Sequence, residues 1–204
     1  MDLQAISAGG GLSIPYQAGE PTIDTAHYFS LWDAARRQIA QDLGHPVGLA
    51  LEPGRYLVAE SGVLVTEVRA TKSQGSQHFV MVDAGFSDLA RPAMYGSFHG
   101  MEIVHADGTL VTGPVQPTVV AGPLCESGDV FTQGEGGVVL QRDLPAAQVG
   151  DLLVVHDTGA YGASMSSNYN TRPLIPEVLV ENNGQTRLIR RKQTVAELVA
   201  LEAV

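Results

Sequence analysis

The pattern of apolar and polar positions divides the chain into two parts with different periods. In the first part, residues 3–7 form a short apolar stretch that runs directly into three glycines. An amphipathic helix is predicted after Asp24 and Thr25, because apolar side chains then recur at helical spacing. This apolar stripe consists of Tyr28, Leu31, Trp32, Ala35, Ile39 and Leu43. Gly44 is well placed to end the helix.

Residues 47–51 then have the pattern of a buried strand that leads into a proline–glycine turn. Strand, helix and strand in this order are typical of a parallel α/β unit. Two strands and one helix cannot close a barrel or cover a parallel sheet on both faces. The unit is therefore incomplete by itself.

From about Gly62 onward the period shortens to that of β-strands. Short strand-like runs alternate with turn signals such as Asp107-Gly108 and Asn183-Gly184. The runs are residues 63–68, 79–82, 118–121, 138–141, 152–156, 178–180 and 187–189. This rhythm predicts a mainly antiparallel β-domain. Thr194 and Glu197 then form a capping-box pattern that opens a short terminal helix.

Composition narrows the class of protein. The chain of 204 residues is 44% apolar and 17% charged, which is ordinary for a globular protein. A net charge of −10 argues against a nucleic-acid partner, which would need a basic face. No apolar run approaches the roughly 20 residues of a membrane span. The first residues lack the features of a secretory signal, and one cysteine cannot form an internal disulfide, so we expect a cytoplasmic protein.

Cys125 is the only cysteine, and it lies between glycines in a segment that also holds Glu126 and Asp129. Because acidic neighbours are costly to bury, we expect an exposed loop and a working thiol rather than a small buried apolar group. A Cys–His hydrolase that pairs Cys125 with His156 is an alternative without local support. The six histidines lack the spacing of a zinc site, so no metal is expected.

Two glycine-bearing turns follow the two strands of the first part. Gly9-Gly10-Gly11 leaves backbone N–H groups free to approach an anion, although a plain tight turn explains it equally well. Glu52-Pro53-Gly54-Arg55 is more informative, because ligands of parallel α/β folds bind at the carboxyl ends of strands. There Arg55 can hold a phosphate or carboxylate in a bidentate manner, and a surface ion pair is the alternative.

Two further loops carry residues suited to substrate binding. Arg91 and Tyr95 lie four residues apart, and a guanidinium and a phenol at this spacing could grip a carboxylate or simply cover surface. Tyr161 stands in Gly159-Ala160-Tyr161-Gly162, where the glycines would let the ring project into a cleft. A core or rim aromatic is an equal alternative for Tyr161.

Taken together, six stretches resemble the bacterial diaminopimelate decarboxylases, which are fold-type III pyridoxal-phosphate enzymes of lysine biosynthesis. The stretches are residues 7–16, 51–55, 82–85, 91–95, 122–129 and 159–173. They follow the family's order over nearly the whole chain, so the match is highly specific. The family pairs a (β/α)8 barrel with a β-domain. The resemblance implies that residues 1–61 are the C-terminal remnant of the barrel and residues 62–204 the mainly antiparallel C-terminal β-domain with its short terminal helix.

The resemblance also implies a cofactor, pyridoxal 5'-phosphate, and the residues that bind it. Gly11, the turn of Pro53 and Gly54, and Arg55 would hold the phosphate. Glu52 would face the pyridine nitrogen and keep it protonated, so that the ring can accept electrons. Tyr161 would touch both cofactor and substrate.

For the substrate, meso-diaminopimelate, the resemblance implies binding by Arg55, Arg91, Tyr95 and Tyr161. Glu126 would recognise the distal amino-acid end. Cys125 would be the acid that reprotonates the α-carbon after carbon dioxide leaves. The family further implies a homodimer in which the loop of Cys125 completes the active site of the neighbouring subunit.

One departure from the family pattern is the lysine that carries the cofactor. The family places it early in the barrel, whereas Lys72 and Lys192 are the only lysines of this chain and neither stands in a family motif. We therefore expect a C-terminal portion that is inactive alone. Two alternatives stay open: a non-catalytic dimerisation or regulatory β-domain, and a sister decarboxylase for ornithine- or arginine-like substrates. Arg91 and Tyr95 favour meso-diaminopimelate, which has an additional distal carboxylate.

Overall fold

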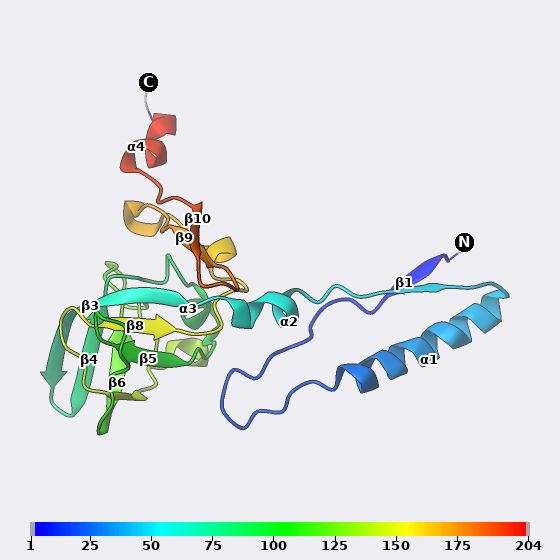
Figure 1. Cartoon of the computed structure of the whole chain (residues 1–204), viewed down its shortest axis with the longest axis horizontal. Helices are drawn as coiled ribbons and strands as arrows, with labels where there is room; N and C mark the ends of the chain where they lie inside the picture. The colour runs from blue at the N-terminus through cyan, green and yellow to red at the C-terminus, as the bar shows by residue number, and fades with distance from the viewer. Residues whose placement is uncertain (1–2, 203–204) are drawn as a thin grey trace.

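The computed structural model describes residues 3–202, and its N-terminal part extends away from a β-rich body (Figure 1). β1 (Ala5–Ser7) and β2 (Gly48–Ala50) pair in parallel, and α1 (Thr25–Leu43) connects them and runs alongside. The Asp24 side chain caps α1 by accepting from the His27 N–H at 2.9 Å, and Gly44 ends it with φ +74°. The predicted helix and both of its ends are confirmed.

The expected burial of the strand at residues 47–51 is wrong. Val47 is buried, but Gly48, Ala50 and Leu51 are exposed. The reason is that the β1–β2 sheet has only two strands, with α1 as its neighbour. The apolar stripe of α1 is likewise only partly covered: Leu31 and Leu43 are exposed. Burial of an apolar strand depends on the layers around it, which the local pattern does not contain.

The body is a six-stranded sheet in the order β5-β8-β3-β4-β6-β7. Its strands are β3 (Leu64–Gln74), β4 (Gln77–Val82), β5 (Met101–Val104), β6 (Val115–Ala121), β7 (Arg142–Pro145) and β8 (Leu152–Val155). All neighbours are antiparallel except β4 and β6, which are parallel, so the predicted mainly antiparallel domain is confirmed. The end strands β5 and β7 approach each other, which nearly closes the sheet into a barrel. Its interior holds Val68, Val80, Ile103, Val120, Leu153 and Val155.

Two details of this sheet differ from the sequence prediction. β5 was not predicted, and the strand expected at residues 138–141 forms instead as β7 at Arg142–Pro145. β7 is defined by its pairing with β6, in which Val115 faces Pro145 and Thr118 faces Arg142. The stretch before it makes only an isolated bridge through Val139. Pairing with β6, rather than the local apolar run, therefore determines where the strand forms.

Short helical segments lie between the strands and at the C-terminal end of the described chain. α2 (Gly54–Val58) and η1 (Ala59–Ser61) lead from β2 into β3, and α3 (Arg91–Tyr95) follows β4. The remaining turns of 3-10 helix are η2 (Glu135–Gly137), η3 (Ala163–Met165), η4 (Tyr169–Thr171) and η5 (Ala200–Glu202). Within residues 3–202 no helix has the length and apolar character to cross a bilayer.

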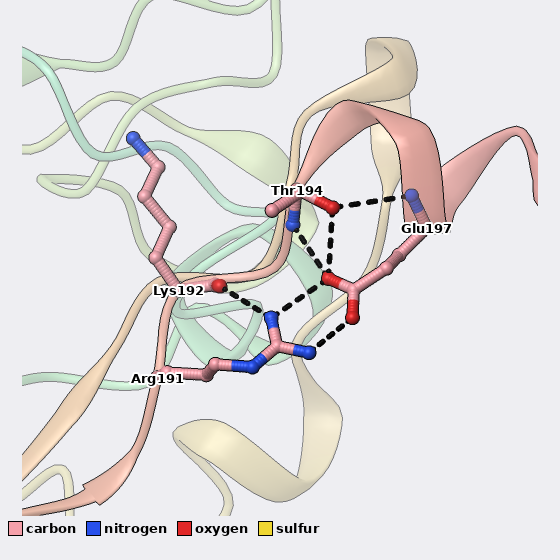
Figure 2. Close-up of polar contacts among 4 residues, drawn as sticks. All are labelled: Arg191, Lys192, Thr194 and Glu197. Atoms are coloured by element: carbon pink, nitrogen blue, oxygen red, sulfur yellow. Dashed lines mark hydrogen bonds and ion pairs between the residues drawn. The ribbon is translucent and has the colours of Figure 1, made fainter.

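The C-terminal part projects from the body as a hairpin followed by a short helix (Figure 1). β9 (Glu177–Val180) and β10 (Thr186–Arg190) are antiparallel, and α4 (Val195–Leu198) comes after them. The predicted capping box at α4 is confirmed: Glu197 N–H donates to Thr194 Oγ1 at 3.2 Å, and Thr194 N–H donates to Glu197 Oε2 at 2.9 Å (Figure 2). Arg191 also donates to both oxygens of Glu197, which ties the hairpin to the helix.

Candidate functional site

The parallel pairing of β1 and β2 places the glycine-rich loop beside the Glu52–Arg55 turn. The ladder continues past the strands, because Glu52 N–H donates to the Gly9 carbonyl at 2.9 Å. Ser7 Oγ donates to Glu52 Oε1 at 2.5 Å and accepts from Gly9 N–H at 3.0 Å. The two motifs, which are some 40 residues apart in the sequence, therefore form one local structure.

Two glycines of this structure have distinct steric roles. A Cβ at Gly10 would lie 2.7 Å from the Glu52 carbonyl oxygen, so the close approach of the two loops requires glycine there. Gly11 has φ +88°, and the direction of its missing Cβ is open space. The loop thus leaves backbone free for a ligand to approach, as an anion site needs.

Two arginines and two tyrosines from distant parts of the chain meet next to this turn. The Arg55 guanidinium carbon lies 5.8 Å from the ring centroid of Tyr16 and 5.6 Å from that of Tyr161. The corresponding distances from Arg91 are 5.1 Å and 5.6 Å. Each guanidinium is within the range of a cation–π contact with both rings. We call these four residues the arginine–tyrosine cluster.

A buried histidine fixes Arg91 in this cluster. Arg91 is only 5% exposed, and it donates to Tyr16 Oη at 3.0 Å and to His99 Nε2 at 3.2 Å. The other ring nitrogen of His99 faces the His156 carbonyl at 2.8 Å, so it carries the proton and leaves Nε2 as the acceptor. Burial, with a smaller effect of Arg91, lowers the pKa of His99 and keeps the ring neutral. Sequence analysis gave neither Tyr16 nor His99 a role in the site.

Tyr161 is held in an uncommon backbone conformation. Its φ is +63°, in the left-handed region that few non-glycine residues occupy. The preceding loop docks tightly on η1, with Thr158 N–H donating to the Gly62 carbonyl at 2.9 Å and Gly159 N–H to the Ala59 carbonyl at 3.0 Å. A Cβ at Gly159 would lie 1.9 Å from the Val58 carbonyl oxygen. This docking is what directs the Tyr161 ring toward Arg55.

The structure separates Arg91 from Tyr95, although both are on α3. Arg91 points into the arginine–tyrosine cluster, whereas the Tyr95 side chain is 57% exposed. Gly96 ends α3 in a left-handed conformation with φ +61°. Tyr95 is therefore available at the surface rather than packed against Arg91.

The segment 122–129, here called the Cys125 loop, is exposed at Cys125 and Glu126, as the sequence predicts, but the expected exposure of its second acid is wrong, because Asp129 is buried. The buried carboxylate of Asp129 anchors this loop. Asp129 is 3% exposed and accepts from Leu124 N–H at 2.8 Å and from Phe86 N–H at 2.7 Å. A Cβ at Gly122 would lie 2.2 Å from Asp129 Oδ2, so the glycine leaves the space that the carboxylate fills.

The polar contacts of Cys125 and Glu126 go to η4 and to the loop itself. Cys125 N–H donates to Asn170 Oδ1 at 2.8 Å, and Tyr169 Oη lies 3.4 Å from Glu126 Oε2. The Gly128 N–H, followed by the Ser127 hydroxyl, lowers the pKa of Glu126 and keeps it anionic. Within residues 3–202 no hydrogen bond joins Cys125 to His156. The Cys–His pair therefore gains no support.

Neither lysine reaches the site. Lys72 is exposed on β3 opposite Phe79, and Lys192 is exposed between β10 and α4, where its side chain points away from the Arg191–Glu197 contact (Figure 2). The described residues contain no group of three histidine, cysteine or acidic side chains that could hold a metal ion.

Comparison with known proteins identifies the family. The model of the family "Pyridoxal-dependent decarboxylase, C-terminal sheet domain" matches residues 23–159. The diaminopimelate decarboxylase of Escherichia coli K12 is 69% identical over 202 residues, which cover 98% of this chain and 48% of the relative. The enzyme of that name from Streptomyces coelicolor is 65% identical over 201 residues, or 98% of this chain and 46% of the relative.

A crystal structure of a diaminopimelate decarboxylase superposes with a TM-score of 0.96 at 68% identity, over 100% of this chain and 48% of that one. The chain thus spans about half the length of the relatives that it matches. The resemblance seen in the sequence and the expected fold class, a barrel remnant followed by a β-domain, are confirmed. This chain belongs to the pyridoxal-dependent decarboxylases, and it contains the C-terminal sheet domain of that family.

Proposed function

We propose that this chain is the C-terminal part of a pyridoxal-phosphate-dependent diaminopimelate decarboxylase, which releases carbon dioxide from meso-diaminopimelate to form lysine in the cytoplasm. The observation that carries the proposal is the meeting of Arg55, Arg91 and Tyr161 beside Glu52 and the glycine-rich loop. These residues come from four separate motifs. In a 69% identical relative named diaminopimelate decarboxylase, 202 aligned residues cover all four.

The residues present fit the cofactor implied by the family. Gly11 offers open backbone, and Gly54 and Arg55 follow Glu52, which is hydrogen-bonded to Gly9 of the same glycine-rich loop, so these three can hold the phosphate. Pro53 shapes the turn, and the Glu52 carboxylate is suited to face the pyridine nitrogen. When bound, pyridoxal phosphate supplies a ring that accepts the electron pair left at the α-carbon by departing carbon dioxide.

The substrate-binding roles follow from charge and position. Arg55 and Arg91 provide guanidinium groups for carboxylates, and each lies 5.6 Å from the ring centroid of Tyr161. Tyr95 is exposed on the same helix as Arg91 and can add a hydroxyl contact. Glu126 is anionic and exposed, as recognition of a distal ammonium group requires. The exposed thiol of Cys125 gives its proton to the α-carbon once carbon dioxide has left.

We further propose a homodimer in which the Cys125 loop of one subunit completes the site of the other. The polar contacts of Cys125 and Glu126 go to Asn170 and Tyr169, and none goes to the arginine–tyrosine cluster. Both residues are exposed, so they are accessible to a second copy. A two-fold dimer would bring each loop to the partner's cluster.

The test is a chimera in which this chain replaces the matching C-terminal part of the E. coli relative. The chimera should release carbon dioxide from meso-diaminopimelate and far less from lysine. A preference for ornithine or lysine would favour a sister decarboxylase, and a folded, dimeric chimera without turnover would favour a non-catalytic β-domain. Cys125→Ala should lower kcat by about 100-fold or more, as loss of a general acid does.

Mixed dimers test the shared site. Arg55→Ala and Cys125→Ala chimeras should each be inactive, and a re-equilibrated equal mixture should regain about a quarter of the parent activity, because half of the dimers then contain one intact site of two. If the mixture stays inactive although the subunits exchange, each site is built within one chain.

A further inference from the structure

We propose that the turn around η4, residues 168–172, positions the Cys125 loop through two side chains: Asn170 fixes the backbone of Cys125, and Tyr169 fixes the carboxylate of Glu126. This inference rests on the proposed function for its catalytic consequence, but its contacts stand independently. Neither residue belongs to the cofactor or substrate contacts assigned above. Both are positioning residues, since they act through Cys125 and Glu126.

The two contacts are separate and address different residues. The Asn170 carboxamide oxygen accepts from Cys125 N–H at 2.8 Å, which is the length of a good hydrogen bond. Tyr169 Oη lies 3.4 Å from Glu126 Oε2, and the Tyr169 ring packs on Phe86 with centroids 4.8 Å apart. Burial and then the neighbouring Glu126 raise the pKa of Tyr169, so its hydroxyl remains a donor.

The turn adopts a strained backbone to present these side chains. Asn170 has φ +52° and Thr171 has φ +56°, two consecutive non-glycine residues in the left-handed region. Asparagine tolerates this region, but it is a true outlier for β-branched threonine. A strained backbone of this kind persists only where the surroundings enforce it, and such residues gather at functional sites.

The surroundings of the turn do enforce it. Asn168 Nδ2 donates to the Arg172 carbonyl at 2.8 Å and to Gln193 Oε1 at 2.7 Å. Arg172 in turn donates to the Asp83 carbonyl at 2.6 Å, next to the end of β4. Gln193 Oε1 also accepts from Leu174 N–H at 3.0 Å. The turn is thus anchored to the sheet on one side and to the C-terminal segment on the other.

Asn170→Gly and Tyr169→Phe each remove one of the two contacts, and two further variants serve as controls. Asn170→Gly removes the acceptor while its backbone is free to keep the left-handed conformation, so loss of folding is not expected. Asn170→Asp retains an acceptor oxygen at the same place. Tyr169→Phe removes the hydroxyl but keeps the ring on Phe86. Asn182→Gly, in the exposed turn of the β9–β10 hairpin, is the matched control for an asparagine-to-glycine change.

The first readout uses the chain itself and is independent of turnover. In Asn170→Gly the backbone amide of Cys125 should exchange with solvent about 3- to 10-fold faster, the equivalent of one hydrogen bond. It should exchange at the parent rate in Asn170→Asp, Tyr169→Phe and Asn182→Gly. An unchanged rate in Asn170→Gly would overturn the proposal whatever the enzyme does.

The second readout is a split between kcat and KM in the chimera. Asn170→Gly should lower kcat about 10- to 100-fold with little change in KM, because the proton donor is misplaced. Tyr169→Phe should raise KM about 3- to 10-fold with little change in kcat, because a recognition residue is loosened. Parallel losses in both constants that follow Tm would show a merely structural turn and overturn the proposal. A parent chimera without activity would refute the proposed function, and amide exchange would still decide on the turn.

Discussion

Asp129 should be the strongest single anchor of the Cys125 loop, and Asp129→Ala tests this. The side chain is 3% exposed, and each carboxylate oxygen accepts one backbone N–H, from Phe86 and from Leu124. A buried N–H without an acceptor costs about 1–3 kcal/mol, so two would cost roughly 2–6 kcal/mol. Burial raises the pKa of Asp129, which means that the buried charge is itself unfavourable. Removing the carboxylate also removes this unfavourable burial, which offsets part of the loss. We therefore expect a destabilisation of about 2–4 kcal/mol.

Urea unfolding and amide exchange measure this effect. Asp129→Asn keeps one oxygen but turns an NH2 group toward the other donor, so its loss should be smaller, about 1–3 kcal/mol. The amides of Phe86 and Leu124 should lose protection in Asp129→Ala. Asp143→Asn on the exposed side of β7 is the control and should change the free energy of unfolding by less than about 0.5 kcal/mol.

The glycine beside Asp129 allows an internal check. Gly122→Ala would place a methyl group 2.2 Å from Asp129 Oδ2 and should be destabilising in the parent. In the Asp129→Ala background the clashing carboxylate is absent, so Gly122→Ala should lower the free energy of unfolding much less. The double-mutant cycle should therefore show strong coupling. Additive effects, or an Asp129→Ala variant within about 0.5 kcal/mol of the parent, would refute the reasoning.

Three further changes have defined outcomes. Burial raises the pKa of Asp88 above 3.8, so its stabilising contribution is complete at low pH and is lost as pH rises through the raised value; the difference in unfolding free energy between parent and Asp88→Asn should fall with increasing pH. Arg191 lowers the pKa of Glu197 below 4.5, so Glu197→Gln should lower Tm at pH 7, and the gap to the parent should close in strong acid. Gly159→Ala places a Cβ 1.9 Å from the Val58 carbonyl oxygen and should cost about 2 kcal/mol or more in urea unfolding.

Local signals explain which elements the sequence predicts. The limits of α1 are predictable because Asp24 and Gly44 act on their own neighbours. The capping box of Thr194 and Glu197 is local in the same sense. The position of β7 is not predictable, because its register depends on β6, some 27 residues earlier. Residues 138–140 are more apolar than β7 and yet remain exposed.

In the candidate site, too, residues in local motifs are predictable and their distant contact partners are not. Cys125, Arg55, Arg91 and Tyr161 stand in compact motifs that can be recognised one by one. Their supporting residues stand elsewhere, and Asn170 meets Cys125 across 45 positions of sequence. The sequence around a single asparagine or histidine does not indicate which distant residue it will contact. The positive φ of Tyr161 and of Asn170 is visible only in the structure.

The two halves of the site are stabilised in different ways, and their surroundings explain why. Arg91 is buried, so a neutral histidine can fix it from within the core without competition from water. Cys125 and Glu126 are exposed, so contacts from within the chain must hold them in place. An exposed loop of eight residues would otherwise be mobile. The buried Asp129 and the Asn170 side chain anchor this loop, and they supply the rigidity that the proposed role of Cys125 as proton donor requires.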